Sequence, residues 1–352
     1  MISVSVIYSY LYVLVANTLV LLMIAYTKFA SARLLNSFLF LAALSLFLSG
    51  ALRKGGPDLS GYRDFYYNAP ERIPDILFSQ IFYLLNSLSV PFEIVLLTMM
   101  ALTLLSIRNI TKIYKVSFLF TFCIYFAYLI PIRDLAQFRF GFAISILLIA
   151  FSINKRRIVA WPLYVIAVLC HYTAIVLLVN IAGSYFVASL RKKYLRLFFL
   201  TIAVLVIFFV GLIIQKLAFI DPRIDLYLNA KGNDGYAVQS ISVVLYYILI
   251  TFSFIFVVRD EIHKKDKRAL VYMMICSIAI FFAFFNTSIF AFRLAHVAAS
   301  LHPIMVAMLF KTVKSGAVGN SRRSFGILAL TIIMLIYIYK ISFGPIIYAI
   351  NF

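Results

Sequence analysis

The chain is poor in charged residues, in acidic residues above all, and in residues that bind metals or form disulfides. Only 12% of its 352 residues are charged and 64% are hydrophobic, whereas about a quarter of the residues in a soluble domain are charged. Its three cysteines, Cys123, Cys170 and Cys276, all lie in apolar segments and match neither a disulfide framework nor a metal site. A soluble protein this apolar could not cover its surface with polar groups, so the composition predicts that lipid is the outer solvent.

Long apolar runs occupy most of the chain. Because an α-helix needs about 20 apolar residues to cross a bilayer, these runs predict an all-α protein, a polytopic integral membrane bundle of about 12 transmembrane helices in a single transmembrane domain, residues 1–352. The expected helices cover residues 2–25, 35–52, 91–107, 116–131, 139–153, 158–171, 172–190, 197–219, 239–258, 269–286, 289–310 and 324–340. The first has no basic residues before it, so we expect a retained helix rather than a cleaved signal peptide.

The net charge of +20 reflects the distribution of basic residues among the loops. Alternate loops hold 21 of the 32 Lys and Arg residues with only three acidic residues beside them, which predicts that these loops are cytoplasmic and that both termini face outward. A multi-pass protein of the bacterial inner membrane fits this bias, and nucleic acid is not an expected partner. The outer loops are then 53–90, 132–138 and 220–238. Residues 75–89 of the first are apolar enough for an interfacial helix.

Two arginines lie where the topology does not require a charge. Arg139 stands at the outer end of helix 139–153, and Arg293 lies about one turn inside the outer end of a later helix, on the same face as His296. A charge near hydrocarbon is costly unless it is paired or hydrated. Arginine stays charged and binds phosphate through two hydrogen bonds, which predicts a site for a diphosphate or a sugar acid. Alternatively, Arg139 reaches lipid phosphate and Arg293 pairs with Glu93.

A histidine and a pair of acidic residues are candidates for proton transfer. His171 lies between two apolar runs and can act as an acid or a base, or it can be a hydrogen-bonded structural residue. Asp58 and Asp64 are six residues apart in the first outer loop, with tyrosines between them. The two carboxylates can act as a base or bind a metal, and the tyrosine rings between them can stack on sugars. Alternatively, all these residues belong to a solvated loop. The candidate substrate-binding residues are Arg133, Gln137, Tyr62, Asp64, His296 and Arg223.

Short motifs of the chain resemble those of the EpsG branch of the Wzy polysaccharide polymerases. They are Gly56-Pro57-Asp58 with Tyr62 and Phe65, the segment from Pro74 through Phe78 and Leu84-Leu85-Asn86 to Phe92-Glu93, Gln137-Phe138-Arg139-Phe140-Gly141-Phe142-Ala143, and Cys170-His171-Tyr172-Thr173-Ala174. Arg293 resembles an arginine in a late helix of the family. The chain departs from the pattern at Ile73, where the family usually has an acidic residue before the proline, and at Thr173, which replaces serine. The resemblance covers about residues 30–310.

The resemblance implies a GT-C-like fold with a lipid-accessible outer cavity and a reaction on the outer leaflet. A growing glycan on undecaprenyl diphosphate is transferred to a new lipid-linked repeat unit, without cofactor, metal or nucleotide sugar. Arg139 and Arg293 would hold the leaving diphosphate, and His171, or else Asp58, would be the base. The implied partners are the undecaprenyl-diphosphate-linked oligosaccharide, membrane lipid and a chain-length regulator protein.

Other functions remain open at this point. An O-antigen ligase would have a larger late outer loop, and a GT-C glycosyltransferase usually carries acidic residues after its first helix. A transporter or flippase of the lipid-linked oligosaccharide would have internal repeats, and the sequence has none. A structural scaffold would leave Arg139, His171 and Arg293 unexplained.

Overall fold

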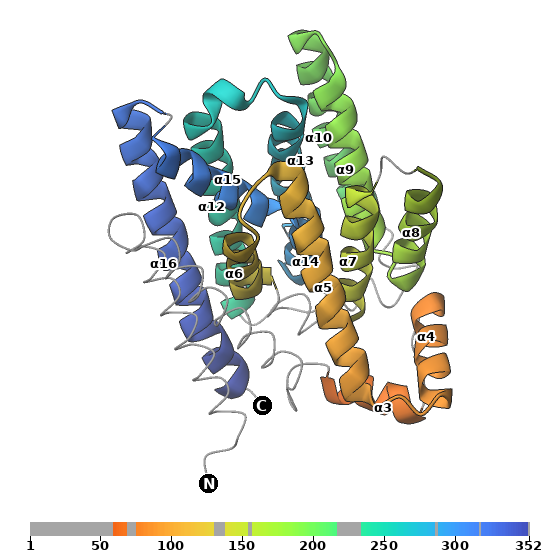
Figure 1. The fold of residues 1–352 in the computed structure, drawn as a ribbon. Coiled ribbons are helices and arrows are strands. Elements are labelled where there is room, and N and C mark those ends of the chain that lie inside the picture. The colour runs from red at the N-terminus through yellow and green to blue at the C-terminus, as the bar shows by residue number, and fades with distance from the viewer. Residues whose placement is uncertain are drawn as a thin grey trace. The chain divides into compact units, whose positions relative to one another are not determined.

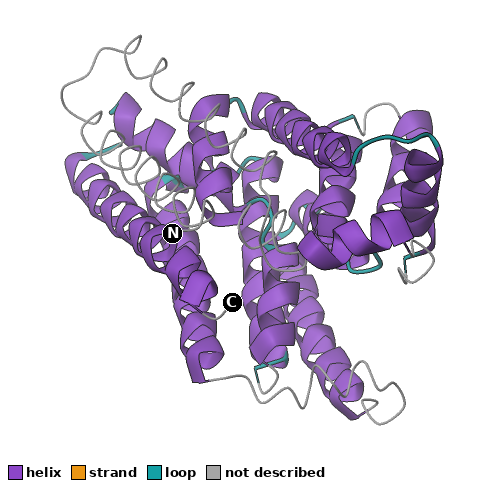
Figure 2. Ribbon diagram, turned by 90° about the horizontal axis from the view of Figure 1, so that it is seen from below, coloured by secondary structure: helices purple, strands orange, loops and turns teal. Residues whose placement is uncertain are grey.

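The computed structural model describes residues 59–68, 75–129, 138–153, 157–216, 234–285, 288–316 and 318–350, and within them the protein is entirely helical (Figures 1 and 2). The α-helices are α3 (Leu59–Asn68), α4 (Ile76–Ser87), α5 (Phe92–Tyr114), α6 (Phe118–Leu129), α7 (Phe138–Ser152), α8 (Arg157–Cys170), α9 (Ala174–Ser189), α10 (Lys193–Lys216), α12 (Asp234–Val257), α13 (Lys265–Ala283), α14 (Ser288–Ala298), α15 (His302–Ser315) and α16 (Asn320–Ile350), with a 3-10 helix at Arg259–Glu261. Two compact units are formed, the first within residues 1–174 and 334–352 and the second within 175–333.

The helices predicted from hydropathy are present wherever the structure describes the chain. The expected helices 2–25 and 35–52 lie outside the described residues. The segment 75–89 contains α4, as expected. Two features differ from the prediction. Helix α3 lies in a segment expected to be loop, and the single helix expected over 289–310 is divided into α14 and α15.

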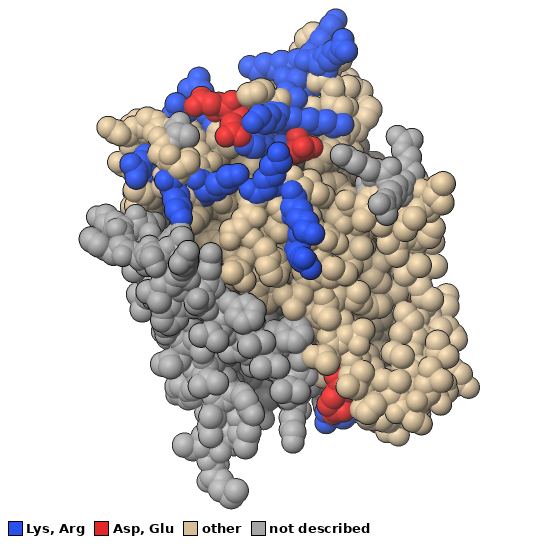
Figure 3. Space-filling model, in the orientation of Figure 1, with Lys and Arg blue, Asp and Glu red and all other residues tan. Residues whose placement is uncertain are grey.

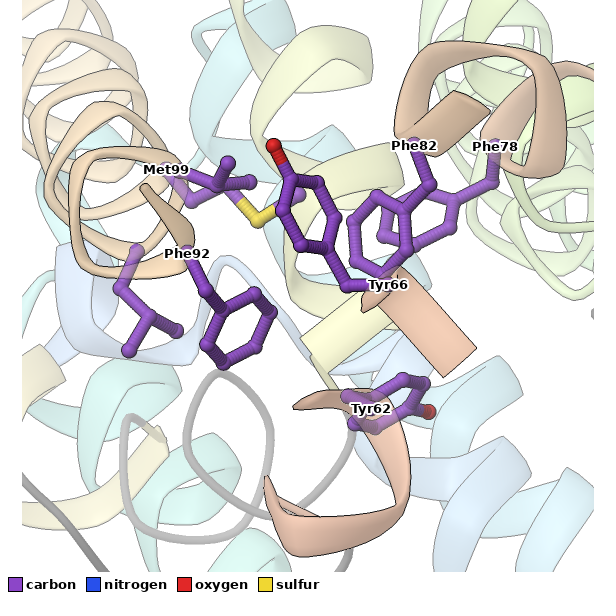
Figure 4. Close-up of a cluster of buried hydrophobic side chains, with 8 residues drawn as sticks. Tyr62, Tyr66, Phe78, Phe82, Phe92 and Met99 are labelled. Atoms are coloured by element: carbon purple, nitrogen blue, oxygen red, sulfur yellow. The ribbon is translucent and has the colours of Figure 1, made fainter. Parts of the chain in front are cut away.

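Helix α3 forms because two of its tyrosines belong to a core. Tyr66 is fully buried, and its hydroxyl donates to the Val90 carbonyl oxygen at 2.6 Å. Its ring lies edge-on to Phe82 and tilted against Phe92, in a cluster that also contains Phe78 and Met99 (Figure 4). This aromatic core joins α3, α4 and the start of α5. Buried aromatic area outweighs the polar residues of α3, which made the segment resemble a loop.

In the first unit, α7 packs against both α5 and α8, and α4 packs against α8. The Thr103 and Ser145 hydroxyls are 3.0 Å apart, linking the middles of α5 and α7. Phe142, near the start of α7, packs on the aromatic core at the start of α5. The two helices are therefore parallel, so the start of α7 lies at the end of α5 opposite Lys112 and Lys115.

Helices α14 and α15 are separate because Pro303 has no N–H group. In a continuous helix the N–H of residue 303 would bond to the Ala299 carbonyl. That carbonyl accepts instead from the His302 N–H at 2.9 Å. The Ala298 carbonyl accepts from Asn180 Nδ2 of α9 at 3.0 Å. The break in the second unit is thus satisfied by groups of the protein itself.

Basic residues concentrate at one end of the second unit (Figure 3). There Arg322 pairs with Asp260 at 2.7 Å, Lys267 pairs with Glu261, and Lys265 lies over the Tyr185 ring. These contacts bring together the end of α9, the turn before α13 and the start of α16. The charge pattern of the sequence predicts that the same segments lie on one side of a membrane.

Two of the described helices are long and apolar enough to span a membrane, judged by length and composition. They are Phe92–Tyr114 and Lys193–Ile213. In the first, 50% of the most apolar stretch is buried within the protein, and in the second only 6% is buried. Shorter apolar helices are Ile76–Ser87, Arg139–Ser152, Ile158–Cys170, Ala174–Ser189 and Val243–Val257. The number of about twelve spans stays a prediction.

The crossing of α10 and α13 gives a stability prediction. A Cβ at Gly211 would lie 2.9 Å from the Ala283 carbonyl oxygen, whereas a Cβ at Gly183 would have nothing within 4 Å. We expect Gly211→Ala to lower stability by about 1–3 kcal/mol through overpacking. Gly183→Ala should be neutral or stabilise by up to about 1 kcal/mol. The thermal midpoints of the purified variants compare the two, and equal shifts would contradict the close approach of α10 and α13.

Candidate functional site

A buried carboxylate lies at the centre of a polar cluster in the first unit. Asp75 directly precedes α4, and only 4% of its side chain is exposed. Its backbone carbonyl accepts a hydrogen bond from the Ser79 N–H at 2.9 Å, but its side chain makes no capping hydrogen bond. The carboxylate instead contacts the side chains of Arg139 and His171. Such partners are needed because burying an unpaired charge is costly.

Arg139, in the first turn of α7, supplies the positive charge. Its Nη1 group forms an ion pair with Asp75 Oδ2. Its Nε–H donates to the Tyr62 hydroxyl at 3.2 Å, and the guanidinium carbon lies 5.7 Å from the centre of the Tyr62 ring. These contacts fix the plane of the guanidinium. Within the described residues Nη2 has no acceptor, so its two N–H groups are available to an anionic or hydroxylated ligand.

His171 lies in the short break between α8 and α9. Its Nδ1 is 3.2 Å and 3.3 Å from the two oxygens of Asp75. Because a carboxylate accepts and does not donate, this contact assigns the proton of a neutral ring to Nδ1 and leaves Nε2 as an acceptor. The ring also contacts Phe140, edge-on with centres 5.8 Å apart, and Tyr172, with centres 5.1 Å apart. The imidazole is therefore held in one orientation.

Helix packing brings together residues that are far apart in the sequence. Asp75 enters with α4, Arg139 with α7 and His171 with the end of α8, and α8 packs against both other helices. The rings of Phe78 and Phe142 meet edge-on, 5.8 Å apart, one turn inward from Asp75 and Arg139. The aromatic core thus positions the starts of α4 and α7 beside each other.

The structure brings three of the predicted site residues, Arg139, His171 and Tyr62, to this one cluster. Asp64 lies on the exposed side of α3, where its carboxylate accepts from Asn68 at 2.6 Å. Four predicted residues fall outside the described part of the chain: Asp58, Arg133, Gln137 and Arg223.

The remaining two predicted residues belong to the second unit. Arg293 lies on α14, and its side chain is outside the described residues. His296 is buried, with Nδ1 2.7 Å from the Tyr247 hydroxyl. The roles of all these residues stay predictions.

Two ion pairs of the first unit involve residues considered in the sequence. Glu93, considered a partner of Arg293, pairs with Arg63 at 2.8 Å, and the Arg293 side chain lies outside the described residues. Arg139, predicted as a fixed cation for a diphosphate or as a contact to lipid phosphate, forms an ion pair with Asp75. The sequence reasoning missed Asp75. The sequence feature that could have indicated Asp75 is that an acidic residue directly precedes an apolar stretch, where a charge needs a specific partner.

Within the described residues, no group of three or more His, Cys, Asp or Glu side chains is placed to hold a metal ion. The described cluster itself supplies a guanidinium, an imidazole and the carboxylate between them. A guanidinium stabilises negative charge, and an imidazole with an acceptor nitrogen takes up a proton.

The two arginine–carboxylate pairs of the first unit give a matched prediction. Arg139→Ala leaves Asp75 buried with only His171 beside it, so we expect a loss of about 2–4 kcal/mol in stability. Arg63→Ala breaks a pair whose side chains are 37% and 51% exposed, and such a pair contributes less than about 1 kcal/mol. Thermal midpoints measured side by side should separate the two, and a larger shift for Arg63→Ala would contradict the burial of the Asp75 pair.

Comparison with known proteins adds one match. The family model described as EpsG family matches residues 36–350, which is most of the chain. No curated protein and no solved structure matches the chain significantly. The resemblance found in the short motifs is confirmed, and the chain belongs to the EpsG family, a Wzy/EpsG-type family of polysaccharide polymerases.

Proposed function

We propose that this protein polymerises oligosaccharide repeat units linked to undecaprenyl diphosphate, on the outer face of the bacterial inner membrane. The growing glycan is transferred from its lipid carrier to a new lipid-linked repeat unit. Family membership supports a polymerase of polysaccharide synthesis. The observation that carries the site assignment is that Arg139 and His171, 32 positions apart, contact the same buried carboxylate.

The apolar surface supports a location in lipid. The Lys193–Ile213 stretch of α10 is highly apolar yet almost unburied. On α8, Ile158, Trp161, Val165 and Leu169 are all more than half exposed and follow helical spacing. An apolar surface of this extent is unfavourable in water and is typical of a lipid-facing helix. We therefore infer a multi-pass protein.

The proposed reaction needs one proton acceptor and one site for negative charge. The acceptor sugar hydroxyl attacks the anomeric carbon of the donor glycan, and a new carbon–oxygen bond forms. The bond from that carbon to the diphosphate oxygen breaks, and its electron pair leaves with undecaprenyl diphosphate. The hydroxyl proton passes to His171 Nε2 and later to water. The diphosphate is already a stable anion, so it needs charge stabilisation more than protonation.

Arg139 suits the stabilising role through its remaining donors. Its Nη1 and Nε are committed to Asp75 and Tyr62, and Nη2 can donate to a phosphate oxygen or to a sugar. Fixed donors of this kind stabilise charge without reorganisation during the reaction. A chain-length regulator is a further proposed partner, on the grounds of the family alone.

The test of function is complementation of a source strain from which the gene is deleted. Surface polysaccharide is separated on a gel, with protein levels checked by blot. We expect a ladder with the wild-type gene and a single repeat unit on the lipid core with His171→Ala. Arg139→Lys keeps the charge but loses the planar fork, so it should also shorten the ladder. If the deleted strain lacks surface repeat units altogether, the defect lies in export or ligation, and the polymerase proposal is wrong.

The sidedness of the site has its own test, because the three native cysteines are buried. Leu88→Cys introduces an exposed thiol between α4 and α5, at the end of α5 where α7 also starts, and Lys264→Cys introduces one in the basic turn before α13. In intact spheroplasts a membrane-impermeant maleimide should label Leu88→Cys and spare Lys264→Cys until the membrane is opened. The reverse labelling would place the cluster on the cytoplasmic side.

A further inference from the structure

Asp75 has a role that neither the motifs nor the family match assigns. We propose that Asp75 is a positioning residue that fixes the proton of His171 on Nδ1, so that Nε2 faces the acceptor sugar as the base, while it holds Arg139 beside the same site. This inference rests on the proposed polymerase function and names how its base is set.

The geometry places one carboxylate between two donors. His171 Nδ1 is 3.2 Å from Oδ1 and 3.3 Å from Oδ2, and Arg139 Nη1 pairs with Oδ2. With 4% of its side chain exposed, Asp75 has little contact with water that could replace these partners. A carboxylate that accepts from Nδ1 selects the tautomer with an unprotonated Nε2. The same arrangement of carboxylate and imidazole orients general bases in other enzymes.

Helix capping does not explain Asp75. It stands at the N-cap position of α4, where an aspartate side chain commonly accepts from the backbone of the first turn. Here its side chain makes no such bond, and the backbone carbonyl alone bonds to the Ser79 N–H at 2.9 Å. A change in the carboxylate therefore leaves the hydrogen bonds of the helix start in place.

Asparagine at this position separates tautomer from shape. A carboxamide has one acceptor oxygen and one NH₂ group. Arg139 only donates, so the oxygen must face Arg139 and the NH₂ group must face His171. The NH₂ group then donates to Nδ1, and the ring proton moves to Nε2, where it blocks proton uptake. Asp75→Asn thus keeps the size of the side chain and changes the tautomer of His171 from Nδ1-protonated to Nε2-protonated.

The experiment is a double-mutant cycle on the purified full chain in phospholipid vesicles. The substrate is lipid-linked repeat unit extracted from the deleted source strain. We expect Asp75→Asn to lower kcat by about 10- to 100-fold with little change in KM. In a His171→Ala background, Asp75→Asn should cause no further loss of kcat, because the asparagine oxygen still accepts from Arg139 and the change acts only through the tautomer of His171. Asp260→Asn, which opens the exposed pair with Arg322, is the matched control and should keep wild-type kcat.

A second pair of variants covers the case in which Asp75→Asn does not accumulate. Asp75→Glu and Asp75→Gln introduce side chains of the same length. The glutamate has two oxygens that accept hydrogen bonds, whereas the glutamine has one oxygen that accepts and one NH₂ group that donates. We expect Asp75→Glu to retain more kcat than Asp75→Gln at equal thermal midpoint.

The outcomes separate the inference from the function. If wild type polymerises but Asp75→Asn keeps full kcat, the positioning role is wrong. It is also wrong if the fold-losses in kcat of Asp75→Asn and His171→Ala multiply in the double variant. In both cases the polymerase proposal is unaffected. Equal kcat for Asp75→Glu and Asp75→Gln contradicts the inference in the same way. If wild type forms no chains from the extracted repeat unit, the proposed function fails, and the inference falls with it.

Discussion

A carboxylate buried in a chain that is 64% hydrophobic must find its partners within the protein. Asp75 finds two, and they arrive on different helices, so the carboxylate specifies how α4, α7 and α8 meet. The aromatic core of Tyr66, Phe78, Phe82 and Phe92 begins at Phe78, one turn along α4 from Asp75, and positions α3 and α4. Packing brings the helices together, and the polar cluster fixes their register, since any slip of one helix would separate the charges.

Hydropathy was enough to find the helices, because continuous apolar runs have little alternative to forming them. It failed where the decisive property was not apolarity. Helix α3 carries polar residues on one side and is held by two buried tyrosines, Tyr62 and Tyr66. The break between α14 and α15 falls inside an apolar run, and its cause is the absence of a single N–H group at Pro303. Propensity and hydropathy averages register neither feature.

The candidate site was predicted in part, for a similar reason. Arg139 and His171 stood out because a cation or a histidine between apolar runs is unusual. Asp75 did not, because an acidic residue ahead of a helix has an ordinary explanation as a cap. Sequence reasoning weighs residues one at a time, whereas the partner of Arg139 lies 64 positions away and becomes evident only in three dimensions.

The broken helix of the second unit is locked from two directions. The Ala298 carbonyl, which a continuous helix would satisfy from residue 302, is bonded to Asn180, and Asn180 Nδ2 also donates to the Met273 carbonyl at 3.1 Å. One side chain of α9 therefore ties α13 to the end of α14. Straightening the helix by replacing Pro303 alone would return the Ala298 carbonyl to its own helix and take one acceptor from the buried Asn180 amide. Replacing Asn180 alone would strand the carbonyl. Mutational drift toward a continuous helix must pass through one of these two states that lack a hydrogen bond, so the kink is protected against change one substitution at a time.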